Sequence, residues 1–213
     1  MEKRILGNSG LRVSRLGLGT MTWGRDTDEH EAADQLKTFL DAGGNLIDTA
    51  AMYGDGDSER VIGGFIGTLA KREDLIIATK AGISFASGER SVNNSRSNLV
   101  ADLDKSISRL GVEYIDLWQI HTWDPMVPLE ETLSAMDQAV SSGRVRYVGV
   151  SNFSGWQLAR AATLQNPLFG KAPIISSQVE YSLLNRSAEV EILPCADDMN
   201  LGFLAWSPLA RGV

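Results

Sequence analysis

The sequence predicts an α/β protein built around a parallel sheet. Short apolar segments alternate along the 213 residues with longer amphipathic segments. The short segments are apolar nearly throughout, which is typical of parallel strands buried on both faces. The predicted strands are Arg15–Gly19, Leu46–Thr49, Leu75–Lys80, Tyr114–His121, Val145–Ser151, Ile174–Glu180 and Gly202–Trp206. No linker or low-complexity tract interrupts the pattern, so we expect a single domain over residues 1–213.

Residues that typically begin and end helices bound the amphipathic segments. Asp28 precedes the first of them, where its carboxylate can cap free backbone N–H groups, and Gly43 follows it. Gly111 and Gly143 end two later helices in the same way, and Pro128 suits the first turn of one of them. Helices are therefore expected between the strands.

Two further segments have weaker helix signals. Ser154 is expected to cap a helix that ends before Pro167. Pro194 lies inside the helical pattern of Ala188–Met199, so a kink or a short first turn is expected there.

Two architectures fit the strict alternation of strands and helices, a doubly wound open sheet and a (β/α)8 TIM barrel. Open sheets that bind dinucleotides carry G-x-G-x-x-G directly after the first strand, and Gly17, Gly19 and Gly24 do not have that spacing. The TIM barrel is therefore favoured. Residues 3–13, with a turn at residues 8–10, predict a β-hairpin that precedes the barrel.

The composition limits the classes of partner. The net charge of −7 disfavours a nucleic-acid partner, because phosphate binding needs clustered Lys and Arg. Cys195 is the single cysteine, so no disulfide framework is expected, which suits a reducing cytoplasm. The first residues lack the apolar run of a signal peptide, and no stretch approaches the ~20 apolar residues of a membrane helix. We expect a cytoplasmic protein with no membrane partner.

Chemically active side chains terminate several predicted strands. Asp48 lies near the end of one strand, with Tyr53 in the loop that follows, while Lys80 and His121 end two others. The carboxyl ends of barrel strands meet at one rim, where TIM barrels have their active sites. Each residue alone has a structural explanation, such as a cap, a surface lysine or a packed ring. Together they predict an active site.

These four side chains suit proton transfer at a carbonyl oxygen. A tyrosine has an ordinary pKa of about 10, and a neighbouring ammonium lowers the pKa of the phenol. A paired carboxylate keeps a buried lysine charged. A neutral histidine can hydrogen-bond a carbonyl oxygen. No side chain donates hydride, so a nicotinamide or a flavin must supply it.

Longer stretches resemble the aldo-keto reductase family in order and spacing. They cover the family's motifs for the catalytic Asp and Tyr, the catalytic Lys, the active-site His, the nicotinamide contacts and the loop that stacks on the nicotinamide. The matching stretches are residues 47–59, 77–80, 116–121, 149–153, 178–186 and 205–212. The loop at Trp206 looks most similar to bacterial reductases related to potassium-channel β subunits.

The resemblance implies a role for each matched residue. Tyr53 would be the general acid in reduction, Asp48 and Lys80 would hold and tune it, and His121 would position the substrate carbonyl. The implied cofactor is NADP(H), with NAD(H) as the alternative. The implied cofactor contacts are Thr20, Met21, Asp48, Ser151, Asn152, Gln178, Trp206, Ser207, Pro208, Leu209, Ala210, Arg211 and Gly212.

The resemblance also implies an activity and a longer barrel. We expect an NADP(H)-dependent oxidoreductase that reduces aldehydes or ketones to alcohols, with Trp23 and Trp123 as walls of the substrate pocket or as packing on the rim. The family continues past Val213, so the last βα unit is expected to be missing from this chain.

Two other functions are alternatives. The first is a nicotinamide-nucleotide-binding sensor with little turnover. The second is a hydrolase or isomerase without a cofactor, and no metal site is expected there because His30 and His121 are the only histidines.

Overall fold

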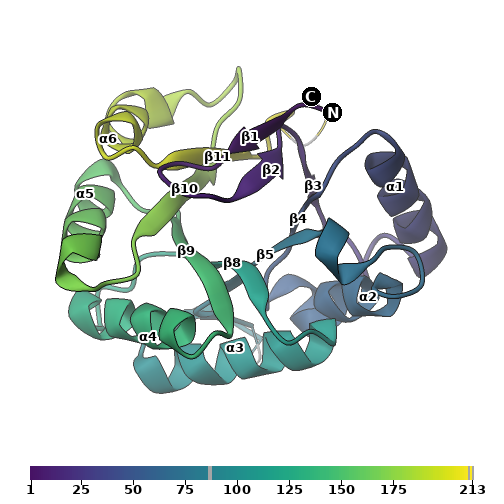
Figure 1. Cartoon of the computed structure of the whole chain (residues 1–213), viewed down its shortest axis with the longest axis horizontal. Helices are drawn as coiled ribbons and strands as arrows, with labels where there is room; N and C mark the ends of the chain where they lie inside the picture. The colour runs from purple at the N-terminus through teal and green to yellow at the C-terminus, as the bar shows by residue number, and fades with distance from the viewer. Residues whose placement is uncertain (86–87, 211, 213) are drawn as a thin grey trace.

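A computed structural model describes residues 1–85, 88–210 and 212, so the predicted cofactor contact Arg211 lies outside the described residues. The chain forms a curled parallel sheet with helices on its outer face (Figure 1). The seven strands of this sheet are β3 (Gly17–Gly19), β4 (Leu46–Asp48), β5 (Ile76–Ala81), β8 (Ile115–Ile120), β9 (Val145–Ser151), β10 (Ile174–Glu180) and β11 (Gly202–Trp206). They neighbour one another in chain order, which confirms the predicted barrel topology. In the described part of the chain, β3 and β11 are the edges of an incomplete barrel.

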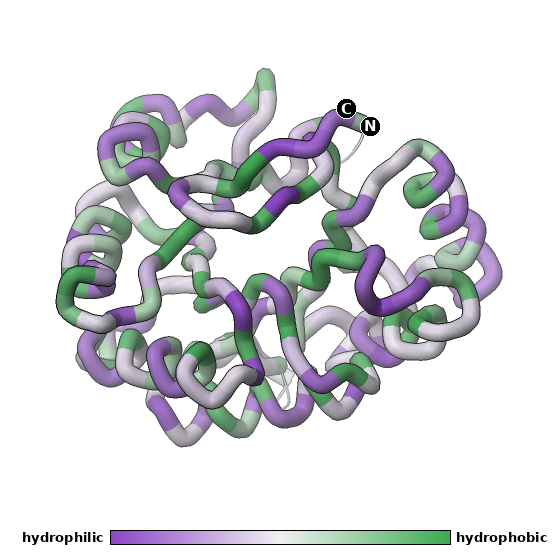
Figure 2. The backbone as a smooth tube through the Cα atoms, viewed as in Figure 1, coloured by the Kyte–Doolittle hydropathy of each residue, from purple (hydrophilic) through white to green (hydrophobic). Residues whose placement is uncertain are grey.

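The outer layer contains the helices predicted from the amphipathic segments. They are α1 (Glu29–Asp41), α2 (Asp57–Phe65), α3 (Arg96–Leu110), α4 (Leu129–Ser141), α5 (Gly155–Leu164) and α6 (Ile192–Asp198). Hydrophobic and hydrophilic residues lie side by side along them (Figure 2). The predicted cap is present on α1, because the Asp28 carboxylate accepts a hydrogen bond from the Glu31 N–H at 2.9 Å. Short 3₁₀ turns accompany the helices at η1 (Tyr53–Gly56), η2 (Arg72–Asp74), η3 (Pro167–Phe169) and η4 (Ser187–Glu189).

A hairpin at the start of the chain seals one end of the barrel. Its strands are β1 (Lys3–Ile5) and β2 (Arg12–Ser14), which pair antiparallel as predicted. Leu6, Leu11 and Val13 pack on apolar side chains inside the barrel, where Leu46 is one of the partners. The polar rim must therefore lie at the opposite end, at the carboxyl ends of the strands.

Side chains alternate between the two faces of the sheet. Ile47, Ile77 and Trp118 point outward into the core between sheet and helices. Asp48 comes one residue after Ile47, and Lys80 comes three residues after Ile77. Both offsets are odd, so both side chains lie on the inner side, as the two-residue strand period requires. The same register thus buries the core and directs charged groups to the barrel interior.

The structure differs from the predicted elements in three places. A short hairpin of β6 (Ile83–Ser84) and β7 (Ser91–Val92) follows β5 and was not predicted. The predicted helix at 188–199 is divided into η4 and α6. The expected effect of Pro194 is seen there, because it lies in the first turn of α6, where its missing N–H breaks no helical hydrogen bond. Burial on both faces was predicted for β11, but this strand is only partly buried. In the part of the chain that the structure describes, β10 is its one strand neighbour and its other edge is unpaired.

Candidate active site

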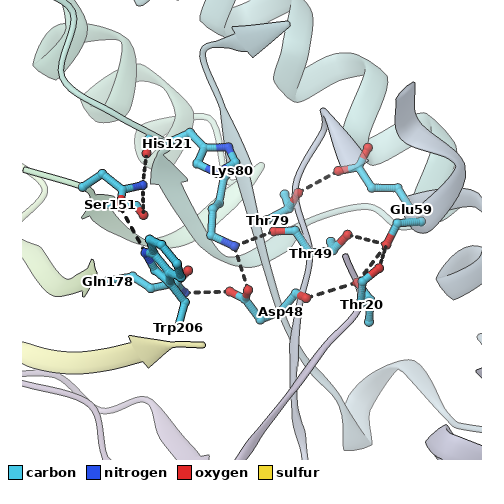
Figure 3. Close-up of polar contacts among 12 residues, drawn as sticks. Thr20, Asp48, Thr49, Glu59, Thr79, Lys80, His121, Ser151, Gln178 and Trp206 are labelled. Atoms are coloured by element: carbon cyan, nitrogen blue, oxygen red, sulfur yellow. Dashed lines mark hydrogen bonds and ion pairs between the residues drawn. The ribbon is translucent and has the colours of Figure 1, made fainter. Parts of the chain in front are cut away.

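An ion pair inside the barrel is the centre of the candidate site (Figure 3). The Lys80 Nζ donates to Asp48 Oδ2 at 2.7 Å and to the Thr49 carbonyl at 2.8 Å. Lys80 is 1% exposed, so its ammonium is removed from bulk water and depends on these partners. The neighbouring strands β4 and β5 deliver both members of the pair to the same end of the barrel.

Tyr53 and His121 complete the cluster. Tyr53 begins η1, the short turn between β4 and α2, and the Lys80 Nζ lies 5.4 Å from the centroid of its ring. The His121 ring lies 6.0 Å from the Tyr53 ring, edge to face at 78°. The structure therefore brings together Asp48, Tyr53, Lys80 and His121, the four residues expected to be catalytic.

The charges of the cluster act on both proton-carrying groups. Burial alone would lower the pKa of Lys80, but the Asp48 carboxylate and then Tyr53 outweigh it and raise that pKa. Burial raises the pKa of Tyr53, and the Asp48 carboxylate adds to the rise, whereas the nearby Lys80 ammonium lowers it. The net rise keeps the phenol protonated at neutral pH.

His121 is held in its neutral form. Burial, followed by the positive charges of Lys80 and Arg90, lowers the pKa of its imidazole to about 3. A neutral imidazole carries one N–H donor and can bind a carbonyl oxygen without bringing a second positive charge beside Lys80.

A buried hydroxyl network fixes the backbone around Asp48. The Ser58 Oγ lies 2.8 Å from the Thr20 Oγ1 and 2.9 Å from the Thr49 Oγ1, and it donates to the Thr20 carbonyl at 2.8 Å. Thr20, an expected cofactor contact, is fully buried and its hydroxyl is used in this network. Met21, the neighbouring expected contact, is exposed on the rim.

The ends of β9, β10 and β11 add polar groups beside the ion pair (Figure 3). Gln178 donates from Nε2 to Asp48 Oδ1 at 2.8 Å. Asn152 donates to the His121 carbonyl at 2.9 Å and to the Ser151 Oγ at 3.0 Å, and it accepts from Trp206 Nε1 at 3.0 Å. The amide of Asn152 thus holds the indole of Trp206 at the rim.

The turn after β11 contains the remaining expected cofactor contacts. Ser207 and Ala210 have left-handed backbone conformations with φ of 49° and 46°, and the Ala210 N–H donates to the Ser207 carbonyl at 2.9 Å. The Gly212 N–H donates to the Leu209 carbonyl at 2.8 Å, and Pro208 and Leu209 are exposed. The chain reverses tightly there.

Of the two roles expected for Trp23, pocket wall and packing, the structure supports packing. Its ring is 1% exposed, packs edge to face on Phe65 and donates from Nε1 to Gln35 Oε1 at 2.9 Å. A ring without exposed surface offers no wall to a ligand, so Trp23 belongs to the core beneath the rim.

Trp123 lies at the rim in a partly buried position. Its ring lies 5.3 Å from that of Phe153 and 5.4 Å from that of Trp156, with edge-to-face geometry. Trp123 therefore keeps a surface that a substrate could contact, together with a packing role.

The rim suits a nicotinamide. The Gln178 amide bonds Asp48, and the partly exposed indole of Trp206 bonds Asn152, so an aromatic face and hydrogen-bonding groups lie beside the ion pair. Among residues 1–85, 88–210 and 212, no group of three or more His, Cys, Asp or Glu side chains could hold a metal ion. In the same part of the chain, no helix is long and apolar enough to cross a membrane.

Two buried polar residues near the site have no role predicted from the sequence. Ser58 and Glu59 follow the Tyr53 loop and are both fully buried. Glu59 lies three residues before the buried Ile62, on the same face of α2, and a charged residue on a buried helix face indicates a buried partner. The bond between Gln178 and Asp48 was not expected from the sequence.

The fold and the rim define a TIM-barrel protein whose site combines a tyrosine, a lysine, an aspartate and a neutral histidine. The chain belongs to the aldo/keto reductase family, whose family model matches residues 15–213. This finding confirms the resemblance seen in the sequence.

Individual relatives support the same family. The uncharacterized oxidoreductase YrpG of Bacillus subtilis is 40% identical, covering 100% of this chain and 68% of that protein. A probable voltage-gated potassium channel subunit beta of Oryza sativa is 37% identical, covering 100% of this chain and 65% of that protein. The crystal structure of a thermostable aldo-keto reductase, Tm1743, in complex with the inhibitor epalrestat has a TM-score of 0.85 at 35% identity, covering 100% of this chain and 75% of that chain. The chain thus spans about two thirds of the length of such curated relatives.

Proposed function

We propose that this protein is an NADP(H)-dependent oxidoreductase that reduces aldehydes or ketones to alcohols, with Tyr53 as the general acid. The observation that carries the proposal is the Tyr53 phenol beside the Lys80 ammonium, which Asp48 holds, with neutral His121 at the same rim. Membership of the aldo/keto reductase family supports the reaction class.

Tyr53 donates its phenolic proton to the carbonyl oxygen of the substrate. Its raised pKa keeps that proton in place until the oxygen becomes negative. The Lys80 ammonium then stabilises the phenolate that remains, because opposite charges attract strongly where water is excluded. Asp48 keeps Lys80 charged and positioned.

His121 orients the carbonyl group. Its imidazole is neutral because burial and the Lys80 ammonium lower its pKa to about 3, so it can donate one hydrogen bond to the carbonyl oxygen. The Tyr53 phenol and the His121 ring then act on the same oxygen from two sides.

Residues of the adjoining strands would hold the nicotinamide. Ser151, Asn152 and Gln178 offer hydrogen-bonding groups for its carboxamide, and Trp206 offers a flat face for its ring. The bound cofactor supplies the hydride that no side chain can provide. The Gln178 amide also contacts Asp48, so cofactor binding and the ion pair share one residue.

A Tyr53→Phe variant tests the assignment of the acid. Loss of NADPH absorbance is followed with a panel of aldehydes and ketones. We expect kcat to fall by about 10²- to 10⁴-fold, the usual contribution of a positioned acid. Tyr114→Phe is the control, because Tyr114 stacks between Arg72 and Arg146 away from the site. Wild-type rates in Tyr53→Phe would show that the acid is another group.

A nicotinamide-binding sensor is the second candidate function. It is favoured by the 37% identity to a protein named as a probable potassium channel β subunit. Such a protein would keep its cofactor through purification and show negligible turnover with the whole panel. Fast release of cofactor and steady turnover would exclude it.

A further inference from the structure

A buried ion pair on the outer side of the sheet lies behind the candidate site. Glu59 of α2 is 0% exposed. Its Oε1 accepts from the Thr79 hydroxyl at 2.7 Å, and its Oε2 accepts from Arg109 Nη1 at 3.1 Å. The carboxylate therefore joins three elements, α2, β5 and α3.

The guanidinium of Arg109 contacts the loop that carries Tyr53 on both sides of the tyrosine. Its Nη1 donates to the Ala51 carbonyl at 3.3 Å, two residues before Tyr53. At Gly56, three residues after Tyr53, an added Cβ would lie 2.4 Å from the guanidinium carbon, so the backbone there lies against Arg109. One charged group thus contacts the loop on each side of the tyrosine.

The other partner of Glu59 is the direct neighbour of the catalytic lysine. Thr79 points out of β5 toward Glu59, and Lys80 points into the barrel toward Asp48. The Ala51 N–H also donates to the Lys80 carbonyl at 3.0 Å. The carboxylate of Glu59 therefore connects the strand that carries Lys80 to the guanidinium that contacts the Tyr53 loop.

Helix-to-sheet packing alone does not require such a pair. A buried ion pair can often be replaced by apolar residues without loss of stability, so stability alone does not account for this pair. The backbone of the Tyr53 loop depends on neighbouring groups to hold it in place, because Gly54 and Asp55 are consecutive left-handed residues with φ of 57° and 51°.

We propose that Glu59 and Arg109 are positioning residues that set the place of the Tyr53 phenol relative to the Lys80 ammonium. This inference rests on the proposed role of Tyr53 as the acid. Neither residue touches the reacting atoms, and both act through the loop backbone and through Thr79.

The chain offers a matched control for this pair. Asp116 of β8 is 1% exposed and bonds the Arg72 Nη2 at 2.6 Å, so it is also a buried carboxylate with a partly buried guanidinium. It also accepts from the Ile77 N–H and lies 3.5 Å from Arg146 Nη1, and within the described residues its hydrogen bonds and ion pairs do not reach the Tyr53 loop. Asp116→Asn and Glu59→Gln therefore remove the same kind of buried negative charge, one from β8 and one from α2.

The test compares Glu59→Gln, Thr79→Val and Asp116→Asn for kcat, for the dissociation constant of NADPH and for the pH profile of kcat. We expect Glu59→Gln to lower kcat by about tenfold or more and to shift the pH profile, with the NADPH constant changed less than threefold. Thr79→Val removes one hydrogen bond and keeps the side-chain shape, so it gives a smaller loss in the same direction and replaces Glu59→Gln if that variant does not fold. Asp116→Asn should keep kcat and the pH profile even where it lowers the thermal midpoint.

A second readout does not need activity. The Tyr53 phenol is titrated by NMR of ring-labelled tyrosine, with its signal assigned through Tyr53→Phe. A shifted Tyr53 titration in Glu59→Gln or Thr79→Val, absent from Asp116→Asn, supports the positioning role even if no substrate is turned over. Wild-type kcat, pH profile and Tyr53 titration in the Glu59 and Thr79 variants, or equal changes in Asp116→Asn, would overturn it.

Discussion

Replacing Asp48 by asparagine would leave the Lys80 ammonium buried without its counter-charge. The two groups are 2.7 Å apart and Lys80 is 1% exposed, so water does not replace the lost carboxylate. At an effective dielectric constant of 20, charges at such a separation attract by roughly 6 kcal/mol, and removing one partner of a buried pair costs about 3–5 kcal/mol. We therefore expect Asp48→Asn to lose about 3–5 kcal/mol of unfolding free energy, a large part of the stability of an ordinary domain.

Urea denaturation of a double-mutant cycle measures this coupling. Lys80→Met in the Asp48→Asn background removes the unpaired charge. The double variant should therefore lose less unfolding free energy than the two single variants together, by about 2 kcal/mol or more. The pKa of Lys80 is raised in the folded protein, so its contribution is fully present below about pH 10.5 and is lost only as the pH rises through the folded value. Measurements at pH 7 to 8 therefore report the whole effect.

The exposed pair of Glu130 and Arg160 is the control for the cycle. Glu130→Gln should leave the urea midpoint unchanged, because water screens exposed pairs. Additive losses at Asp48 and Lys80 would refute the reasoning, because they would show that the two charges do not depend on each other.

Three further outcomes are expected. The His121 imidazole should stay neutral down to about pH 4 in an NMR titration, because burial and then nearby cations lower its pKa to about 3. The unfolded chain binds that proton near pH 6.5, so the unfolding free energy should fall by up to about 5 kcal/mol between pH 6.5 and 3. A titration midpoint above pH 6 would contradict both statements. Gly56→Ala should lose more unfolding free energy in urea than Gly67→Ala. Both glycines have a left-handed φ, which costs a residue with a Cβ about 1–2 kcal/mol, but only the Cβ at position 56 meets Arg109. Equal losses would exclude that contact. Trp206→Leu should remove most of the fluorescence quenching caused by NADPH, and unchanged quenching would show that the indole does not face the cofactor.

Much of the fold was predictable because its signals are local. Apolar runs of strand length and helix-ending glycines each depend on a few neighbouring residues, so the order of strands and helices follows from them. The hairpin of β6 and β7 escaped prediction, since each strand has two residues and too little pattern to recognise. The limited burial of β11 also escaped, because it depends on the neighbours of an edge strand and not on its composition.

The sequence by itself determined which residues end the strands, and with them the cluster of Asp48, Lys80 and His121, because parallel strands in a barrel all direct their carboxyl ends to one rim. Only the tertiary structure decided which groups touch. It buried Trp23 in the core, and it paired Gln178 with Asp48 across 130 positions of the chain. The physical reason is that such contacts depend on how far the sheet curls and how the helices pack on it, and no local pattern of side chains carries that information.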